Sequence, residues 1–469
     1  MDAKALEKRV SDFWEREVVP ALMEFIRIPN ESPAFDREWR AHGHMDRAVQ
    51  LVADWVGRQG IAGCTVDVLR DGERTPLVFV EIEGRREGTV VIYGHLDKQP
   101  PMVGWRDGLG PWTPVLSKDG KLYGRGSGDD GYAVFAAVSA IEALQALGAE
   151  HPRIVLLIEC SEESGSHDLP HYLNSCKKRI GRPELVICLD SGCGNYERLW
   201  CTTSLRGLLM GSLKVEVLDE GVHSGMAGGI VPSPIRILRR LLDRLEDPDT
   251  GDLRPEAFHV EIPQERIEQA RQAAEALGNS VVKDFPFVAG ARPESDSVEE
   301  LLIRSSWKAA LAITGQEGIP APGEGGNVLL PFVKVKLSIR IPPGVDPGRA
   351  GQAARDVLQA DPPYGARVTV SLGGMSGWEA PPMAPWLGEA LHAASRAFFG
   401  RDARLFGAGG TIPFMPMIGR HFPEAQFLTT GVLGPHSNAH GPNEFLHVPF
   451  AKKLCCCLAQ IIAEIPPRT

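Results

Sequence analysis

The sequence contains no long uncharged apolar run and no dense block of basic residues. No window of about 18 residues is both apolar and uncharged, which argues against a transmembrane helix. Residues 1–7 lack the apolar core of a signal peptide. The net charge is −10, which argues against nucleic acid or an anionic membrane as the main partner. We therefore expect a cytoplasmic protein that binds neither nucleic acid nor a membrane.

The spacing of the cysteines does not indicate disulfide bonds. The nine cysteines form no C-x-x-C pair, and an odd count of this kind indicates reduced thiols. Three of them are consecutive, Cys455–Cys457, in an apolar stretch with helical spacing. Adjacent side chains on a helix point in different directions and cannot bind one metal together. We predict that these three thiols fill the core.

The length and the order of apolar segments predict two domains. A chain of 469 residues is too long for one ordinary core, and 43% hydrophobic with 23% charged residues is typical of a globular protein. Runs that are apolar on both faces alternate with helical patterns, which predicts an α/β fold with a mixed, largely parallel sheet covered by helices. The predicted strands are 77–82, 90–93, 154–158 and 185–189, and the predicted helices are 5–28, 44–60 and 132–147.

The pattern changes after about residue 206. Residues 333–339 alternate between apolar and polar, which indicates a sheet with one solvated face. We predict a smaller α+β insert with strands at 208–217, 333–339 and 367–372, helices at 234–245 and 347–358, and added helix at 255–315. The first pattern then resumes with a helix at 386–399, a run at 426–429 and a helix at 449–464. The expected division is a catalytic domain of residues 1–205 and 378–469, interrupted by an insert of residues 206–377.

A histidine and an aspartate follow the predicted strand at 90–93. His95 and Asp97 are two residues apart, so in an extended segment they project to the same side. Imidazole nitrogen and carboxylate oxygen are ligands that zinc and other first-row metals accept. Alone, such a pair is more often part of a capped loop.

Further acids and a histidine stand at comparable places along the chain. Each has a simple explanation by itself: a helix N-cap, solvated acids, a turn aspartate or a surface histidine. In an α/β sheet, however, ligands bind beyond the carboxyl ends of the strands, where all of these side chains are expected. Together they could hold two metal ions bridged by a carboxylate, with one of two adjacent glutamates free as a base. They are Asp129-Asp130 in the glycine-rich loop 124–131, Glu162-Glu163 after the run 154–158, Asp190 after the run 185–189, and His440 in the loop 440–444.

These motifs, in this order, resemble a known family. It is the dinuclear zinc metallopeptidases that include carnosinase, cytosolic non-specific dipeptidase, succinyl-diaminopimelate desuccinylase, acetylornithine deacetylase and glutamate carboxypeptidase. Gln99-Pro100, Gly104-Trp105 and the segment 122–126 look most like the carnosinase-type branch. The motifs that carry the resemblance are Tyr93–Asp97, Gly124–Asp129, Glu162-Glu163, Asp190 and His440–Glu444.

The resemblance implies a role for each of these side chains. Asp97 would orient His95, Glu162 would be the general base, and the bond between Asp129 and Asp130 would be cis. The cofactor would be two divalent metal ions, with Zn²⁺ first and Mn²⁺ or Co²⁺ as alternatives. One metal would be held by His95 and Asp190 and the other by Glu163 and His440, with Asp129 bridging them.

The insert resembles the lid and dimerisation domain of the same family. His223, from the other subunit of a homodimer, would support the developing oxyanion. Arg340 and the loop 409–413, including Gly410 and Thr411, would bind a substrate carboxylate, and Asn327 would approach the substrate. Taken alone, His223 is a turn histidine and Arg340 is the end of a solvated strand face.

The expected function is therefore that of a metal-dependent amide hydrolase. The substrate would be a dipeptide or short peptide with a free carboxylate, and the same metal core would also suit a deacylase of N-acyl amino acids. A catalytically inactive metal-binding scaffold is a third interpretation. Three residues depart from the family pattern and bear on substrate preference: Lys98, Gly131 and Ala408.

Overall fold

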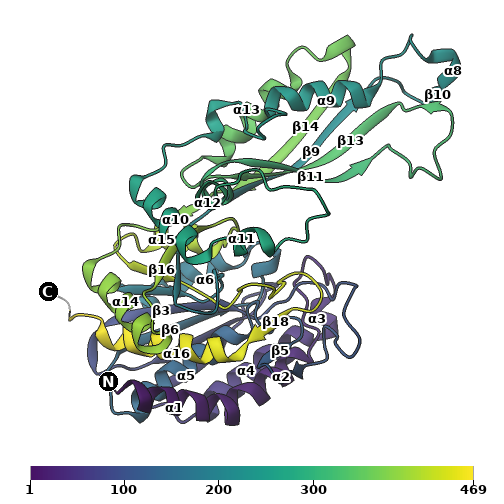
Figure 1. Cartoon of the computed structure of the whole chain (residues 1–469). Coiled ribbons are helices and arrows are strands. Elements are labelled where there is room, and N and C mark those ends of the chain that lie inside the picture. The colour runs from purple at the N-terminus through teal and green to yellow at the C-terminus, as the bar shows by residue number, and fades with distance from the viewer. Residues whose placement is uncertain (1, 468–469) are drawn as a thin grey trace. The chain divides into compact units, whose positions relative to one another are not determined.

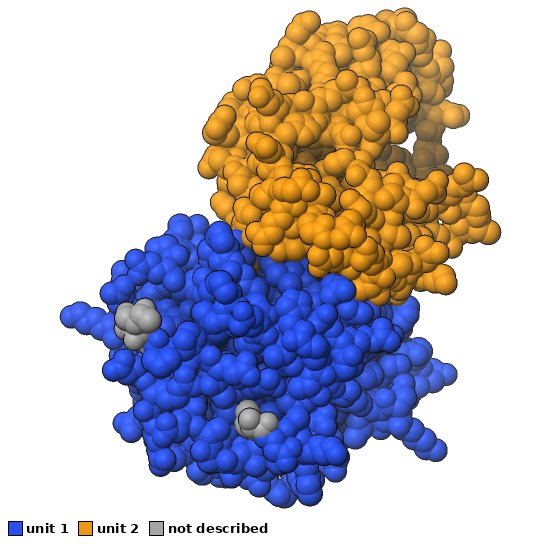
Figure 2. Space-filling model, turned by 60° about the vertical axis from the view of Figure 1, so that its left-hand side comes forward, with its two compact units in different colours: residues 1–203, 380–406, 412–469 blue, residues 204–379, 407–411 orange. Residues whose placement is uncertain are grey.

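In the computed structural model, the chain folds into two compact units (Figure 2). Unit 1 consists of Met1–Thr203, Ala380–Phe406 and Ile412–Thr469, and unit 2 of Ser204–Glu379 and Gly407–Thr411. The structure describes residues 2–467. Met1 and residues 468–469, at the two ends of the expected catalytic domain, lie outside the described residues.

The α/β class predicted for the chain is confirmed. Within residues 2–467 the largest sheet has nine strands, and its four central strands, β6, β3, β7 and β17, run parallel. Antiparallel strands flank them, so the sheet is mixed. In sheet order the strands are β1 (Cys64–Leu69), β2 (Leu77–Ile82), β6 (Pro152–Glu159), β3 (Arg86–His95), β7 (Leu185–Cys188), β17 (Gln426–Thr429), β8 (Trp200–Leu205) and β15 (Trp378–Glu379), with β16 (Arg404–Ala408) pairing with β8.

Helices cover both faces of β3 (Figure 1). Gly94 faces Ala133 on α5 (Tyr132–Ala146), and a Cβ on Gly94 would lie only 2.6 Å from the Ala133 Cβ. The preceding residue, Tyr93, stacks on Phe414 of α15 (Phe414–His421), with ring centroids 3.7 Å apart. Because successive strand residues point to opposite faces, α5 and α15 lie on opposite sides of β3.

The remaining helices of unit 1 pack around this sheet. Helix α5 is buried along nearly its whole length and contacts both α1 (Ala3–Phe13) and α16 (Val448–Glu464). Cys455–Cys457 are buried in α16, as predicted, and no cysteine within residues 2–467 forms a disulfide. The other helical segments are η1 (Trp14–Val18), α2 (Val19–Ile26), α3 (Trp39–His42), α4 (His44–Arg58), η2 (Glu162–Ser164), α6 (Leu169–Ser175), α7 (Lys177–Ile180) and α14 (Pro385–Phe399).

A small sheet brings two distant loops together. Strand β18 (Phe445–His447) pairs with β5 (Lys121–Tyr123), which also pairs with β4 (Val115–Leu116). The pairing places Phe445 opposite Tyr123. The loop that follows β5 and the loop that precedes β18 therefore lie side by side.

Unit 2 is built on an antiparallel sheet. The strand order is β11 (Ala310–Glu317), β13 (Phe332–Ile341), β9 (Gly207–Glu216) and β14 (Arg367–Met375). Alternate residues of β13 are buried against α9 (Pro234–Leu245) and α13 (Pro347–Gln359), which matches the predicted one-sided pattern. The shorter elements are β10 (Val222–His223), α8 (Ser224–Ala227), η3 (Glu256–Phe258), α10 (Gln264–Leu277), α11 (Ser280–Lys283), α12 (Val298–Trp307), β12 (Val328–Leu329) and η4 (Pro363–Gly365).

The predicted helical stretch at 255–315 is wrong at its end. Ala310–Glu317 forms the edge strand β11, paired with β13 on one side only. Most of its side chains are exposed on both faces. A strand without a buried face carries no period-two apolar pattern, so the sequence offered no signal for it.

No helix within residues 2–467 combines the length and the apolar character needed to cross a bilayer.

Candidate metal centre

The carboxyl ends of three adjacent parallel strands carry the expected ligands. Strand β3 lies between β6 and β7 in the sheet. His95 ends β3, Glu162 and Glu163 follow β6, and Asp190 follows β7. Strand order therefore places these side chains next to each other, as expected for a ligand site in an α/β sheet.

Asp129 lies between the two histidines. Its Oδ1 is 3.3 Å from His95 Nε2, and its Oδ2 is 3.0 Å from His440 Nε2. Asp190 Oδ1 is 3.9 Å from His95 Nε2, and Glu163 Oε2 is 3.4 Å from His440 Nε2. Two groups result, in each of which the potential ligand atoms all lie within 4.8 Å of one another. They are His95–Asp129–Asp190 and Asp129–Glu163–His440.

Two atoms of this site are buried without a hydrogen-bond partner among the described residues. They are His95 Nε2 and Glu163 Oε1. A buried polar atom without a partner costs about 1–3 kcal/mol, so such atoms favour a site that binds an ion. The nitrogen and oxygen donors, with no thiolate, suit divalent metal ions. The residues present therefore fit such ions in both groups.

Burial raises the pKa of three acids of the site. Burial and the nearby charge of Asp190 raise the pKa of Glu162 well above its usual value. Burial likewise raises the pKa of Asp190 and of Glu163. Ionised carboxylates repel each other in a low-dielectric pocket, and a bound cation favours their charged forms. The crowding of acids is thus a second indication of a cation site.

Asp97 holds the segment that carries Glu162 and Glu163. Its Oδ1 accepts a hydrogen bond from the backbone N of Glu162 at 3.1 Å, and its Oδ2 accepts one from that of Glu163 at 3.0 Å. The backbone O of Asp97 lies 3.0 Å from His95 Nδ1, and its Oδ1 lies 3.4 Å from the same atom. Asp97 therefore contacts both the histidine and the glutamate turn. The bond between Asp129 and Asp130 is cis, as the resemblance implied.

Glu159 is a neighbour of the site that the sequence analysis did not single out. This buried carboxylate accepts hydrogen bonds from the hydroxyls of Tyr93 at 2.6 Å, Ser166 at 2.8 Å and Ser161 at 3.2 Å. The two serines bracket Glu162 and Glu163, so Glu159 and Asp97 together hold this turn. The available signal was an acid directly after the apolar run 154–158.

Lys98 donates its hydrogen bonds to backbone carbonyls outside the two ligand groups. It is fully buried, and its Nζ donates to the backbone carbonyls of Phe25 at 2.8 Å and Ile28 at 2.7 Å, at the end of α2. The ammonium also lies 4.0 Å from the centre of the Phe25 ring. Lys98 thus caps a helix, and its departure from the family pattern has a structural explanation.

The expected substrate-binding residues all belong to unit 2 and form two separate groups. Arg340 Nη1 donates to Thr411 Oγ1 at 3.0 Å, next to Gly410. The backbone O of Asn327, five residues before β13, accepts from the backbone N of Ser224, the residue after His223. Arg340 is eight positions along β13 from its first residue, Phe332, a span of roughly 27 Å.

Arg206 is a second cation near Arg340 that the sequence analysis missed. Burial and the charge of Arg340 lower the pKa of Arg206 to about 10. Burial also lowers the pKa of Arg340. Thr411 Oγ1 donates to the backbone O of Arg206 at 2.5 Å, which ties the loop 409–413 to the junction between β8 and β9. The Arg206 guanidinium donates to the backbone carbonyls of Arg304, Lys308 and Gly409 at 3.3–3.4 Å, so it holds the loop that carries Gly410 and Thr411.

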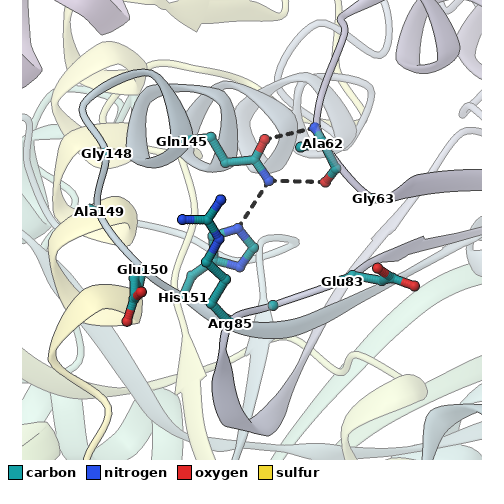
Figure 3. A pocket seen from close by; sticks show the side chains of 10 residues that line it. Ala62, Gly63, Glu83, Arg85, Gln145, Gly148, Ala149, Glu150 and His151 are labelled. Atoms are coloured by element: carbon teal, nitrogen blue, oxygen red, sulfur yellow. Dashed lines mark hydrogen bonds between the residues drawn. The ribbon is translucent and has the colours of Figure 1, made fainter.

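A pocket at the other end of β6 does not share these features (Figure 3). It has a volume of about 290 Å³ and is lined in part by Gln145 and His151. These two side chains hydrogen-bond to each other at 3.1 Å, and Gln145 also binds the backbone of Ala62. Their polar atoms are therefore satisfied within the protein.

Comparison with known proteins connects this site to a family. The model of peptidase family M20/M25/M40 matches residues 91–464. Beta-Ala-His dipeptidase of Homo sapiens is 28% identical over 440 residues, which cover 87% of this chain and 82% of that protein. Cysteinylglycine-S-conjugate dipeptidase of Corynebacterium striatum is 25% identical over 379 residues, which cover 78% of this chain and 79% of that protein. The structure of the di-peptidase Dug1p of Saccharomyces cerevisiae superposes with a TM-score of 0.78 at 20% identity, covering 99% of each chain, and so shares the fold.

Proposed function

The chain belongs to peptidase family M20/M25/M40, and on this premise we propose that it is a metal-dependent dipeptidase. It would hydrolyse the amide bond of a dipeptide or short peptide that ends in a free carboxylate. The similar Beta-Ala-His and cysteinylglycine-S-conjugate dipeptidases support this substrate class. The observation that carries the proposal is the pair of ligand groups that share Asp129, beside the free carboxylate of Glu162.

We assign one metal ion to His95 and Asp190 and the other to Glu163 and His440, with Asp129 between them. Zinc is the first choice because the donors are imidazole and carboxylate, and manganese or cobalt would also suit them. When bound, two such ions lower the pKa of a water ligand towards about 7 and neutralise charge that develops on the scissile carbonyl oxygen.

Glu162 is proposed as the general base. Its Oε2 lies 4.0 Å from His95 Nε2, yet Glu162 belongs to neither ligand group, so its carboxylate is available to the substrate water. It would take a proton from that water and pass it to the leaving nitrogen. Asp97 and Glu159 would hold the turn on which this carboxylate stands.

We propose that Arg340 binds the substrate carboxylate, together with Thr411 and Gly410. Replacing Arg340 with methionine removes a charge-assisted interaction worth about 1.5–3 kcal/mol. We expect KM for a dipeptide to rise about 10–100-fold with a smaller change in kcat. Steady-state kinetics on a dipeptide and on its C-terminal amide will check this. If the variant loses as much on the amide as on the free acid, Arg340 does not recognise the carboxylate.

A deacylase of N-acyl amino acids would use the same metal core and the same carboxylate site. Kinetics on dipeptides, N-acetyl amino acids and N-succinyl amino acids will separate the two activities. We expect the highest kcat/KM on dipeptides. A preference for an N-acyl amino acid would overturn the assignment, and a metal-loaded protein that cleaves nothing in the panel would favour an inactive scaffold.

We further propose a homodimer through unit 2, in which His223 acts on the site of the partner. His223 lies in the separate two-stranded sheet of β10 and β12, next to the Phe332 end of β13, whereas Arg340 lies near the opposite end of β13, which makes it difficult for both to serve one site from the same chain. Large apolar side chains around His223 are exposed: Met226 by 79%, Ile230 by 80% and Val328 by 50%. Exposed apolar clusters of this kind mark protein interfaces. Asn327, beside His223, would approach the substrate from the same side.

Mixing two inactive variants tests this arrangement. His223→Ala should lower kcat by about 10²–10³-fold, as for other oxyanion donors. If His223 acts in the partner's site, subunit exchange between His223→Ala and Glu162→Gln should restore up to about a quarter of the wild-type activity. Activity that stays at the level of the separate variants, with heterodimers shown by native mass spectrometry, would place His223 in its own chain's site.

A further inference from the structure

A fully buried ion pair joins the two loops that carry Asp129 and His440. Arg125 Nη1 lies 2.6 Å from Glu444 Oε2, and the two side chains are 1% and 0% exposed. Arg125 belongs to the loop after β5, and Glu444 stands directly before β18. The backbone N of Gly124 also donates to the backbone O of Glu444 at 3.0 Å.

Each member of the pair contacts the backbone beside a proposed metal ligand. Arg125 Nη2 donates to the carbonyl of His440 at 3.1 Å and to that of Gly441 at 2.9 Å. Glu444 Oε1 accepts from the backbone N of Gly128 and of Asp129, both at 3.2 Å. Arg125 thus holds the loop of His440, and Glu444 holds the loop of Asp129.

The loop of His440 needs such support. His440 has a φ of 65°, in the left-handed region that a non-glycine residue adopts at a cost, and its side chain is 57% exposed. His95 and Asp190, in contrast, stand at the ends of buried parallel strands. The two ligand groups therefore differ in how their histidines are held in place.

We propose that Arg125 and Glu444 are positioning residues for the Asp129–Glu163–His440 metal group. They set the distance between Asp129 and His440, while the His95–Asp129–Asp190 group depends on them less. This inference rests on the proposed function because it assumes two metal ions. A buried ion pair is by itself a weak source of stability, so a role in alignment explains its place better than a role in folding.

The test measures metal binding by variants in the full chain. Arg125→Met and Glu444→Gln are stripped with a chelator, reloaded with Zn²⁺ and analysed by zinc titration and elemental analysis. We expect the Asp129–Glu163–His440 site to lose about 10–100-fold in affinity for zinc. Bound zinc should then fall from about two towards one per chain at limiting zinc. Excess zinc should recover part of kcat, with KM for the dipeptide nearly unchanged.

Arg9 and Glu142 supply a control ion pair outside the two metal groups. This pair joins α1 to α5, with Arg9 Nε 3.1 Å from Glu142 Oε2. Arg9→Met and Glu142→Gln should lower the melting temperature and leave both zinc sites intact. A double variant, Arg125→Met with Glu444→Leu, leaves no unpaired buried charge and should recover stability without recovering the second zinc.

The outcomes separate the two proposals. Folded Arg125 or Glu444 variants, the double variant included, that bind two zinc ions with wild-type affinity would overturn the positioning role. A wild-type protein that binds two zinc ions and cleaves no peptide would instead overturn the proposed function and leave the positioning role standing.

Discussion

Replacing Glu162 with glutamine is expected to lower kcat by about 10²–10⁴-fold, the usual contribution of a general base. Glutamine has nearly the same shape but cannot accept the proton of the attacking water. The backbone N of residue 162 would still be held by Asp97, so the turn should keep its conformation. Glu162 belongs to neither ligand group, and metal content should therefore not change. Single-turnover kinetics on a dipeptide, with elemental analysis of the same sample, measures both.

The neighbouring residue provides the control for this variant. Glu163→Gln alters a member of the Asp129–Glu163–His440 group and should reduce bound metal as well as activity. If Glu162→Gln keeps the wild-type rate at unchanged metal content, Glu162 is not the base. If it loses metal as Glu163→Gln does, Glu162 is a ligand.

Replacing Asp129 with alanine should have a comparably large effect because Asp129 is the one residue common to both ligand groups. One of its oxygens faces His95 and the other faces His440. Its loss should weaken both metal sites and lower activity by about 10³-fold or more, since several kcal/mol of charge stabilisation would be lost. Elemental analysis after dialysis should find less than one metal ion per chain.

Asp190→Ala is the comparison for Asp129→Ala. Asp190 belongs only to the His95–Asp129–Asp190 group, so this variant should keep the metal of the other group. Equal metal contents in the two variants would mean that Asp129 does not bridge. Retention of two ions by Asp129→Ala would remove the basis of the dinuclear assignment.

The sequence predicted strands well where both faces are apolar. The predicted strands at 77–82 and 426–429 coincide with β2 and β17, because a strand that is buried on both faces is a nearly continuous apolar run. The helix predicted at 234–245 coincides with α9, whose apolar face packs against the unit 2 sheet. The exposed strand β11 was missed because its formation depends on pairing with β13, which leaves no pattern in its own residues.

The sequence predicted where functional side chains stand along the chain better than it predicted which groups they contact. The sequence placed Lys98 next to the site, but only the packing of α2 against this loop shows that its ammonium binds backbone carbonyls. Arg125 and Glu444 lie in motifs that the sequence analysis used, yet 319 residues separate them. Contact at that separation depends on the pairing of β5 with β18, which neither segment signals alone.

The amino-acid sequence by itself determined the chemistry that is available, imidazoles and carboxylates at the ends of apolar runs, and the order of these motifs carried the resemblance that implied a metal-dependent hydrolase. Only the tertiary structure decided which oxygen of Asp129 faces which histidine, and which buried charges hold the loops. The physical reason is that ligand types are local properties of a chain. Distances between ligands, in contrast, follow from strand order and loop pairing across hundreds of residues.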